Sequence, residues 1–405
     1  MINERDFIRF VGKLVFNPDQ CGWGQMPPEQ MECFCVQAEK AGLEILFLLT
    51  LGDALPKKFH DAFSQVHHRE AMTRLIEKAQ LMAFNRLLDE QHIPHLAFKG
   101  ADLAFRIYPA PALRPHVDWD VLFPRDDCQT VIRTLAAQGW QTYSGRPLEE
   151  IQGWTHHYER MHNDKSSIEI HWTLPHFGSA APEEIWKETE RDATGQIHLT
   201  PEMNLLMLCA HASGEDYSHV SDWRLLLDAG YILKHDTIDW KKVRALADRW
   251  GIIRPDLLLS FWKDFFPEET IPLNDIDLMK QAALREVFQL RGQIHRAKKY
   301  DKSIVPGKKG VWPWLKDRLG FYFRPGSICG KYKLQRHQIF RIFACAVWDF
   351  AGKSWYFCTH YFSRQCQDIR RFRKALDYVE NGSKMRNPPP LDVATNGQTG
   401  QQGDE

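Results

Sequence analysis

The chain has 405 residues, no formal net charge and 26% charged residues. This length can bury a large core and predicts two or three subdomains, so it excludes a single small module. The nine cysteines form no Cys-x-x-Cys pair, and Cys33-x-Cys35 has no second half that would complete a zinc site. The odd cysteine count and the first residues, MINERDF, which do not resemble a signal peptide, predict a reducing, cytoplasmic setting. No uncharged stretch is long enough to span a membrane.

Residues 1–90 are predicted to form a helical N-terminal segment. Apolar residues between 34 and 48 recur at helical spacing, with Gly42 as a weak point, and predict helices that pack. Residues 68–91 predict a longer amphipathic helix that covers one face of a sheet. Its expected apolar side carries Met72, Leu75, Ala79, Met82 and Leu87. We assign this helix no chemistry.

The stretch 95–123, HLAFKGADLAFRIYPAPALRPHVDWDVLF, is the centre of the chain. It predicts a buried strand over 95–98, a tight turn at Lys99-Gly100, a short helix over 101–108 and a strand over 117–123. Because strand side chains alternate between faces, Asp118 and Asp120 should point the same way, and Val117, Trp119 and Val121 the other way. Two close carboxylates repel each other unless a cation lies between them, and Mg²⁺ prefers such oxygen ligands.

A second pair of strands is predicted from residues 156–172, HHYERMHNDKSSIEIHW. The apolar pattern alternates on both sides of Asn163-Asp164, which is typical of a hairpin. In its second strand, Ile168, Ile170 and Trp172 share one face, whereas Ser167, Glu169 and His171 share the other.

The order strand, glycine turn, helix and strand with Asp-x-Asp resembles the core of the DNA polymerase β-like nucleotidyltransferase fold. The fuller string is Phe98-Lys99-Gly100, then Tyr108-Pro109, then Arg114-x-x-x-Asp118-x-Asp120. It is similar to a bacterial family of uncharacterised nucleotidyltransferases related to the toxins of abortive-infection systems. The resemblance runs from about residue 90 to about residue 255.

The resemblance implies an α/β (α+β) fold, in which a small mixed sheet is flanked by N-terminal helices and a larger helical C-terminal part. It implies that Asp118, Asp120 and Glu169 are the catalytic, metal-binding acids, with Mg²⁺ or Mn²⁺ as cofactor. For Glu169, the following His171-Trp172 matches the family's acid-apolar-His-Trp string; the alternative is an ordinary surface glutamate.

Lys99, Gly100 and Arg114 are the predicted nucleotide-binding residues. The fold normally has Gly-Ser or Gly-Gly in its first turn, whereas this chain has Gly100-Ala101 and lacks that hydroxyl. Gly100 still permits close backbone approach to a phosphate, next to the amides of the helix predicted from Ala101. The alternatives are a solvated turn lysine for Lys99 and a structural ion pair for Arg114.

The remaining chain is divided by composition. We predict a nucleotidyltransferase core over 91–175, a helical domain over 176–300, a basic, aromatic-rich segment over 301–380 and a disordered tail over 381–405. In the helical domain, His211 is either a substrate contact or a satisfied core histidine. Residues 291–375 hold 20 Lys plus Arg against 4 Asp plus Glu, which suits contact with an anionic membrane surface or nucleic acid.

Two functions from different classes are compatible with these patterns. The first is an enzyme that transfers a nucleoside monophosphate from an NTP to a hydroxyl of RNA, a protein or a small molecule. The second is an inactive binding protein that keeps the fold and attaches to an anionic surface. The missing turn serine and the bulky Val117 and Trp119 favour the second, whereas retention of all three acids favours the first.

Overall fold

The computed structural model describes residues 3–142, 147–151, 156–163, 166–177, 180–214, 222–272 and 281–287, with 371, 375, 378 and 379. Among these, the residues up to Pro272 form one compact unit, and those from 281 onwards belong to a second. The predicted basic segment 301–380 lies outside the described residues except for residues 371, 375, 378 and 379, and the predicted tail 381–405 lies wholly outside them. The domain boundaries stay predictions.

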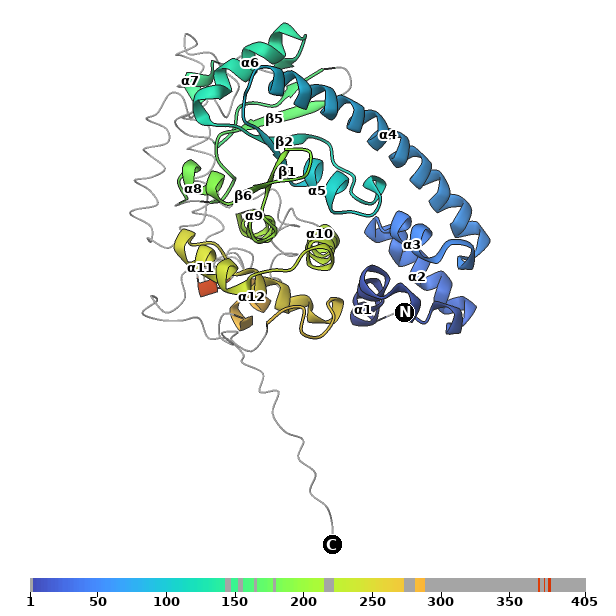
Figure 1. Ribbon diagram of the computed structural model, residues 1–405. Helices are drawn as coiled ribbons and strands as arrows, with labels where there is room; N and C mark the ends of the chain where they lie inside the picture. The colour runs from blue at the N-terminus through green and yellow to red at the C-terminus, as the bar shows by residue number, and fades with distance from the viewer. Residues whose placement is uncertain are drawn as a thin grey trace, which may run out of the picture. The chain divides into compact units, whose positions relative to one another are not determined.

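Four helices open the first unit (Figure 1): α1 Glu4–Phe16, α2 Pro28–Ala41, α3 Glu44–Leu51 and α4 Lys57–Glu90. Gly42 has φ +70° and ends α2, which separates the two helices that the apolar spacing predicted. Aromatic rings pack between these helices and α1: the ring centroids of Phe7 and Phe10 on α1 lie 4.7–6.2 Å from those of Phe34 on α2 and Phe47 on α3. The prediction of packing helices is confirmed.

The centre of the first unit is a five-stranded mixed sheet. Its elements are β1 Leu96–Phe98, α5 Gly100–Arg106, β2 Trp119–Leu122, α6 Cys128–Ala137, β3 Gln141–Thr142, α7 Leu148–Ile151, β4 Met161–His162 and β5 Ser167–His171. The strand order is β1-β2-β5-β4-β3. The β2/β5 pair is parallel, whereas the other neighbours are antiparallel. The predicted fold class and the hairpin of β4 and β5 are confirmed.

One face of this sheet is apolar because alternate strand residues point to the same side. Trp119 and Val121 of β2 and Ile168 and Ile170 of β5 are at most 1% exposed and belong to one core cluster. Helix α4 runs along the sheet and contributes Leu81, Phe84 and Leu88 to this cluster. The opposite face of β2 and β5 is thereby left for polar residues.

Helix α4 starts earlier than predicted and buries a different side. Met72, Leu75 and Met82, expected to face the sheet, are 58%, 63% and 54% exposed. The buried side includes Arg74 and Glu77, and the indole Nε1 of Trp119 donates a 2.7 Å hydrogen bond to Glu77 Oε1. Arg74 also contacts His116, so both charged residues have partners on the side of the helix opposite the exposed Met72 stripe.

Truncation of α4 residues distinguishes the two faces. Leu88→Ala should lower the free energy of unfolding by about 2–5 kcal/mol, because Leu88 is fully buried in the core cluster. Leu75→Ala, on the exposed stripe of the same helix, should change it by no more than about 0.5 kcal/mol. Urea unfolding followed by circular dichroism measures both. Equal losses for the two variants would contradict this orientation of α4.

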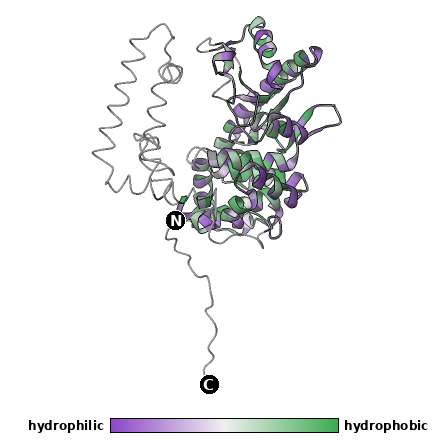
Figure 2. Cartoon of the chain, turned by 90° about the vertical axis from the view of Figure 1, so that its left-hand side faces the viewer, coloured by the Kyte–Doolittle hydropathy of each residue, from purple (hydrophilic) through white to green (hydrophobic). Residues whose placement is uncertain are grey.

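The helical half follows the sheet. Its elements are α8 Pro182–Lys187, β6 Thr189–Arg191, β7 Ile197–Leu199, α9 Pro201–Gly214, α10 Asp222–His235, α11 Trp240–Trp250 and α12 Pro255–Leu259. Asp239 caps α11 by accepting hydrogen bonds from two of its backbone amides, and Gly251 ends that helix with φ +67°. Figure 2 shows hydrophobic and hydrophilic residues on the same helices, as expected of amphipathic elements sharing a core. Among the described helices, none has the length and apolar character needed to cross a membrane.

Candidate active site

Two of the predicted acids lie side by side on neighbouring strands. In the parallel β2/β5 pair, Asp120 is the partner of Glu169, and Trp119 is the partner of Ile168. Because Trp119 and Ile168 point into the core, Asp120 and Glu169 point to the opposite face. This pairing brings together two carboxylates that are 49 residues apart in the sequence.

Asp118 joins them from just outside the strand, because β2 begins at Trp119 and not at residue 117 as predicted. The guanidinium of Arg160 connects Asp118 and Glu169, with Nη2 2.5 Å from Asp118 Oδ2 and 3.0 Å from Glu169 Oε1. Burial and the charges of Asp120 and Glu169 raise the pKa of Asp118. One ligand atom each from Asp120, Glu169 and His171 lie within 4.8 Å of one another, close enough to share a metal ion, whereas Asp118 is joined to Glu169 through Arg160.

Asp120 is held by a lysine and a histidine. Lys99 Nζ and His171 Nε2 each lie 3.0 Å from Asp120 Oδ1. Burial opposes ionisation of Asp120, but the His171 hydrogen bond and the Lys99 charge outweigh it and keep its pKa below the usual range. For Glu169, burial is likewise outweighed, chiefly by His171, and its pKa falls to about 2. Both acids are therefore ionised at neutral pH.

The turn that leads into α5 differs from the prediction. The helix starts at Gly100, and the positive φ, +54°, belongs to Lys99. A Cβ added to Gly100 would lie 2.6 Å from His116 Cβ, so glycine is required there for space. Non-glycine residues with such dihedrals cost roughly 1–3 kcal/mol and cluster at functional sites.

Arg114 lies at the pocket but is engaged in a buried ion pair. Its Nε and Nη2 lie 2.6 and 2.9 Å from the two carboxylate oxygens of Asp228 on α10. Tyr108 donates a further 2.6 Å hydrogen bond to Asp228. The structural ion pair left open for Arg114 is thus present, and its predicted contact with nucleotide stays a prediction.

A cavity of about 460 Å³ connects these groups. The sheet side carries all six predicted site residues, and α9 and α10 supply the opposite wall with Met207, Leu208, His211, Arg224, Leu225 and Asp228. Burial, together with the charge of Lys99, lowers the pKa of His211 to about 4, so its ring is neutral. His211 lines the same cavity as the acids, and its contact with substrate stays a prediction.

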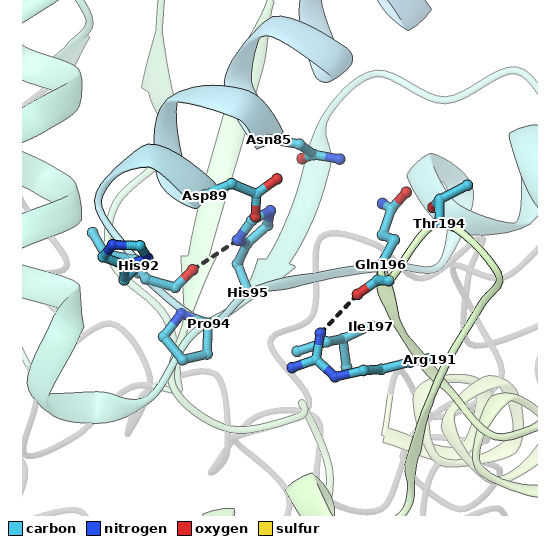
Figure 3. Close-up of a pocket in the computed structure, with 11 residues that line it drawn as sticks. Asn85, Asp89, His92, Pro94, His95, Arg191, Thr194, Gln196 and Ile197 are labelled. Atoms are coloured by element: carbon cyan, nitrogen blue, oxygen red, sulfur yellow. Dashed lines mark hydrogen bonds between the residues drawn. The ribbon is translucent and has the colours of Figure 1, made fainter.

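A second pocket of about 470 Å³ lies between the end of α4 and the β6–β7 hairpin (Figure 3). Two of its polar side chains form hydrogen bonds with nearby backbone: His95 Nδ1 bonds to Ile93 O, and Arg191 donates to Gly195 O. Asp89 is the carboxylate among its lining residues. We assign this pocket no chemistry.

Sequence reasoning missed Arg160, His171 and Arg224 as site residues. His171 was accessible to prediction, since it lies two residues after Glu169 and shares its face of β5. Arg160 precedes β4, and Arg224 comes from α10, so their positions depend on the tertiary fold. No local pattern in the sequence marks either of them.

The model of one protein family, described as uncharacterised nucleotidyltransferase, matches residues 29–262. No curated protein and no solved structure matches the chain. The matched region contains α4, the whole sheet with its three acids, and helices α9 and α10 that close the cavity. With more than half of its length matched, the chain belongs to the family of uncharacterised nucleotidyltransferases.

Proposed function

We propose that this protein is a metal-dependent nucleotidyltransferase that transfers a nucleoside monophosphate from an NTP to an acceptor hydroxyl. Asp118, Asp120 and Glu169 would hold Mg²⁺ or Mn²⁺, for which carboxylate oxygens are suitable ligands. When bound, the cation would lower the pKa of the acceptor hydroxyl and neutralise charge on the triphosphate. We also propose that the protein is related to the nucleotidyltransferase toxins of bacterial abortive-infection systems. We propose that it acts in the cytoplasm.

The observation that carries the proposal is the convergence of three carboxylates on one polar cavity with a lysine at its wall. Asp120 and Glu169 are register partners, and Asp118 is joined to Glu169 through Arg160. Lys99 Nζ bonds to Asp120 at this wall, where its charge can meet a phosphate oxygen. Gly100, the next residue in the chain, also lines this cavity.

The alternative, an inactive binding protein, was suggested in part by the bulky side chains of Val117 and Trp119 next to the acids. The positions of these two side chains do not favour it. Trp119 is 1% exposed in the core on the opposite face of β2, so it does not fill the cavity. Val117 lines the cavity but is 81% exposed. Contact of residues 291–375 with an anionic surface stays a proposal, because almost all of this segment lies outside the described residues.

The direct test is incubation of the full chain with α-³²P-labelled NTPs, Mg²⁺ or Mn²⁺, and RNA, protein and small-molecule fractions of a cell extract. Label should enter one fraction, with one preferred nucleotide, and should require the divalent ion. Glu169→Gln should remove the labelling, whereas Glu190→Gln, an exposed change on β6, should keep it. Absence of label in all fractions with all four NTPs would contradict turnover.

A further inference from the structure

Three histidines lie together beside the acids. One ring nitrogen from each of His156, His157 and His171 lies within 4.8 Å of the other two. The ring centroids are 4.5 Å apart for His156–His157 and 5.1 Å for His157–His171. We propose that these three imidazoles bind a transition-metal ion of the Zn²⁺ class, at a site that adjoins the acids and shares His171 with the group of Asp120 and Glu169.

The backbone holds this cluster in place. His157 is the antiparallel bridge partner of His171, at the end of β5. On either side of this bridge, Trp172 N donates to His156 O at 3.2 Å, and Tyr158 N donates to Ile170 O at 2.8 Å. The backbone that carries the three histidines is therefore held by an ordered ladder, which favours a preorganised site.

His171 supplies the independent observation that points to a ligand. Its side chain is 1% exposed, and its Nε2 bonds to Asp120. Its Nδ1 is buried and has no hydrogen-bond partner within the described part of the chain. Metal-binding histidines commonly use one ring nitrogen for the ion and the other for a carboxylate, which is the arrangement that Asp120 and His171 offer.

The ligand set defines the class of ion. Neutral imidazoles suit Zn²⁺ and its neighbours among the transition metals, whereas Mg²⁺ selects carboxylates, carbonyls and water. Three histidines leave a fourth tetrahedral position open. Bound there, the ion would fix the 156–158 segment against β5 and hold the His171 ring that orients Asp120. This inference goes beyond nucleotidyl transfer and does not depend on it.

The test uses the chelator-treated full chain, saturating Mg²⁺ to occupy the acids, and Co²⁺ as a spectroscopic probe. We expect visible d–d absorption from about one bound Co²⁺ per chain, removed by about one equivalent of Zn²⁺. His157→Gln should weaken Zn²⁺ binding by at least 10- to 100-fold, the cost of losing even an outer partner of a metal ligand. His68→Gln, exposed on α4, is the matched control and should bind like wild type.

Two further measurements make the outcome decisive. Asp118→Asn should keep Zn²⁺ binding, and X-ray absorption of the Zn²⁺-loaded wild-type chain should show imidazole nitrogen scattering. The X-ray absorption measurement uses the wild-type chain, so it does not require that a variant folds. Wild-type Zn²⁺ affinity in His157→Gln, loss of the ion in Asp118→Asn, or oxygen-only coordination would each overturn the proposal. None of these results bears on labelling by NTPs, so the two proposals fail separately.

Discussion

Asp120→Asn should reduce divalent-ion-dependent nucleotide transfer by more than about 100-fold, equivalent to roughly 2.7 kcal/mol of transition-state stabilisation. Changes to the outer partners of metal ligands already cost about 10–100-fold, and Asp120 is proposed as a ligand itself. The asparagine oxygen can still accept hydrogen bonds from Lys99 and His171, so the fold should persist. Initial rates of labelling at saturating NTP measure the loss.

The matched control for this variant is Asp126→Asn. Asp126 is exposed beyond the end of β2, where the same chemical change removes a charge that does not face the cavity. It should keep the wild-type rate. Circular dichroism of both variants separates lost chemistry from lost folding. A rate for Asp120→Asn within tenfold of wild type would contradict its proposed role.

Asp228→Asn should lower the free energy of unfolding by about 3–5 kcal/mol, the largest stability effect that we expect. The side chains of Arg114 and Asp228 are 8% and 1% exposed, so this variant leaves a buried guanidinium without its counter-charge. Denaturant unfolding should show a lower midpoint with an unchanged slope. An unchanged midpoint would mean that the Arg114–Asp228 pair does not hold α10 to the core.

Glu32→Gln is the control, because it makes a similar change in an ion pair that is exposed instead of buried. Glu32 pairs with Lys58 at 3.0 Å, and their side chains are 52% and 60% exposed. Solvent screens such a pair, so its loss should cost no more than about 1 kcal/mol. Replacing both buried partners, as Arg114→Leu with Asp228→Leu, should recover part of the stability lost in Asp228→Asn, because no unpaired charge then remains.

The central placement of Asp120 and Glu169 was predictable because it depends on strand periodicity, which the sequence displays. Alternation placed Trp119 and Ile168 in the core and the two acids on the opposite face, as the β2/β5 register has them. The weak point at Gly42 was readable for a similar reason, since a glycine that ends a helix acts within one helical turn.

Features that depend on distant partners were not predictable. Helix α4 has two apolar stripes, and the choice between them depends on contacts such as that of Glu77 with Trp119, 42 residues away. Arg114 meets Asp228 across 114 residues, and no local pattern reports that pair. At the turn before α5, the clash with His116 explains Gly100, whereas the left-handed backbone belongs to Lys99.

Calorimetric titration with a nonhydrolysable NTP, with and without Mg²⁺, tests most directly whether the three acids form a metal-dependent nucleotide site. Wild type should bind tightly only with Mg²⁺. Lys99→Ala should weaken binding by about 1.5–3 kcal/mol and keep the Mg²⁺ requirement, because it removes one charge-assisted contact. Asp120→Asn should bind equally weakly with and without Mg²⁺. Wild-type, Mg²⁺-dependent affinity in Asp120→Asn would contradict a metal-dependent nucleotidyltransferase site at these acids.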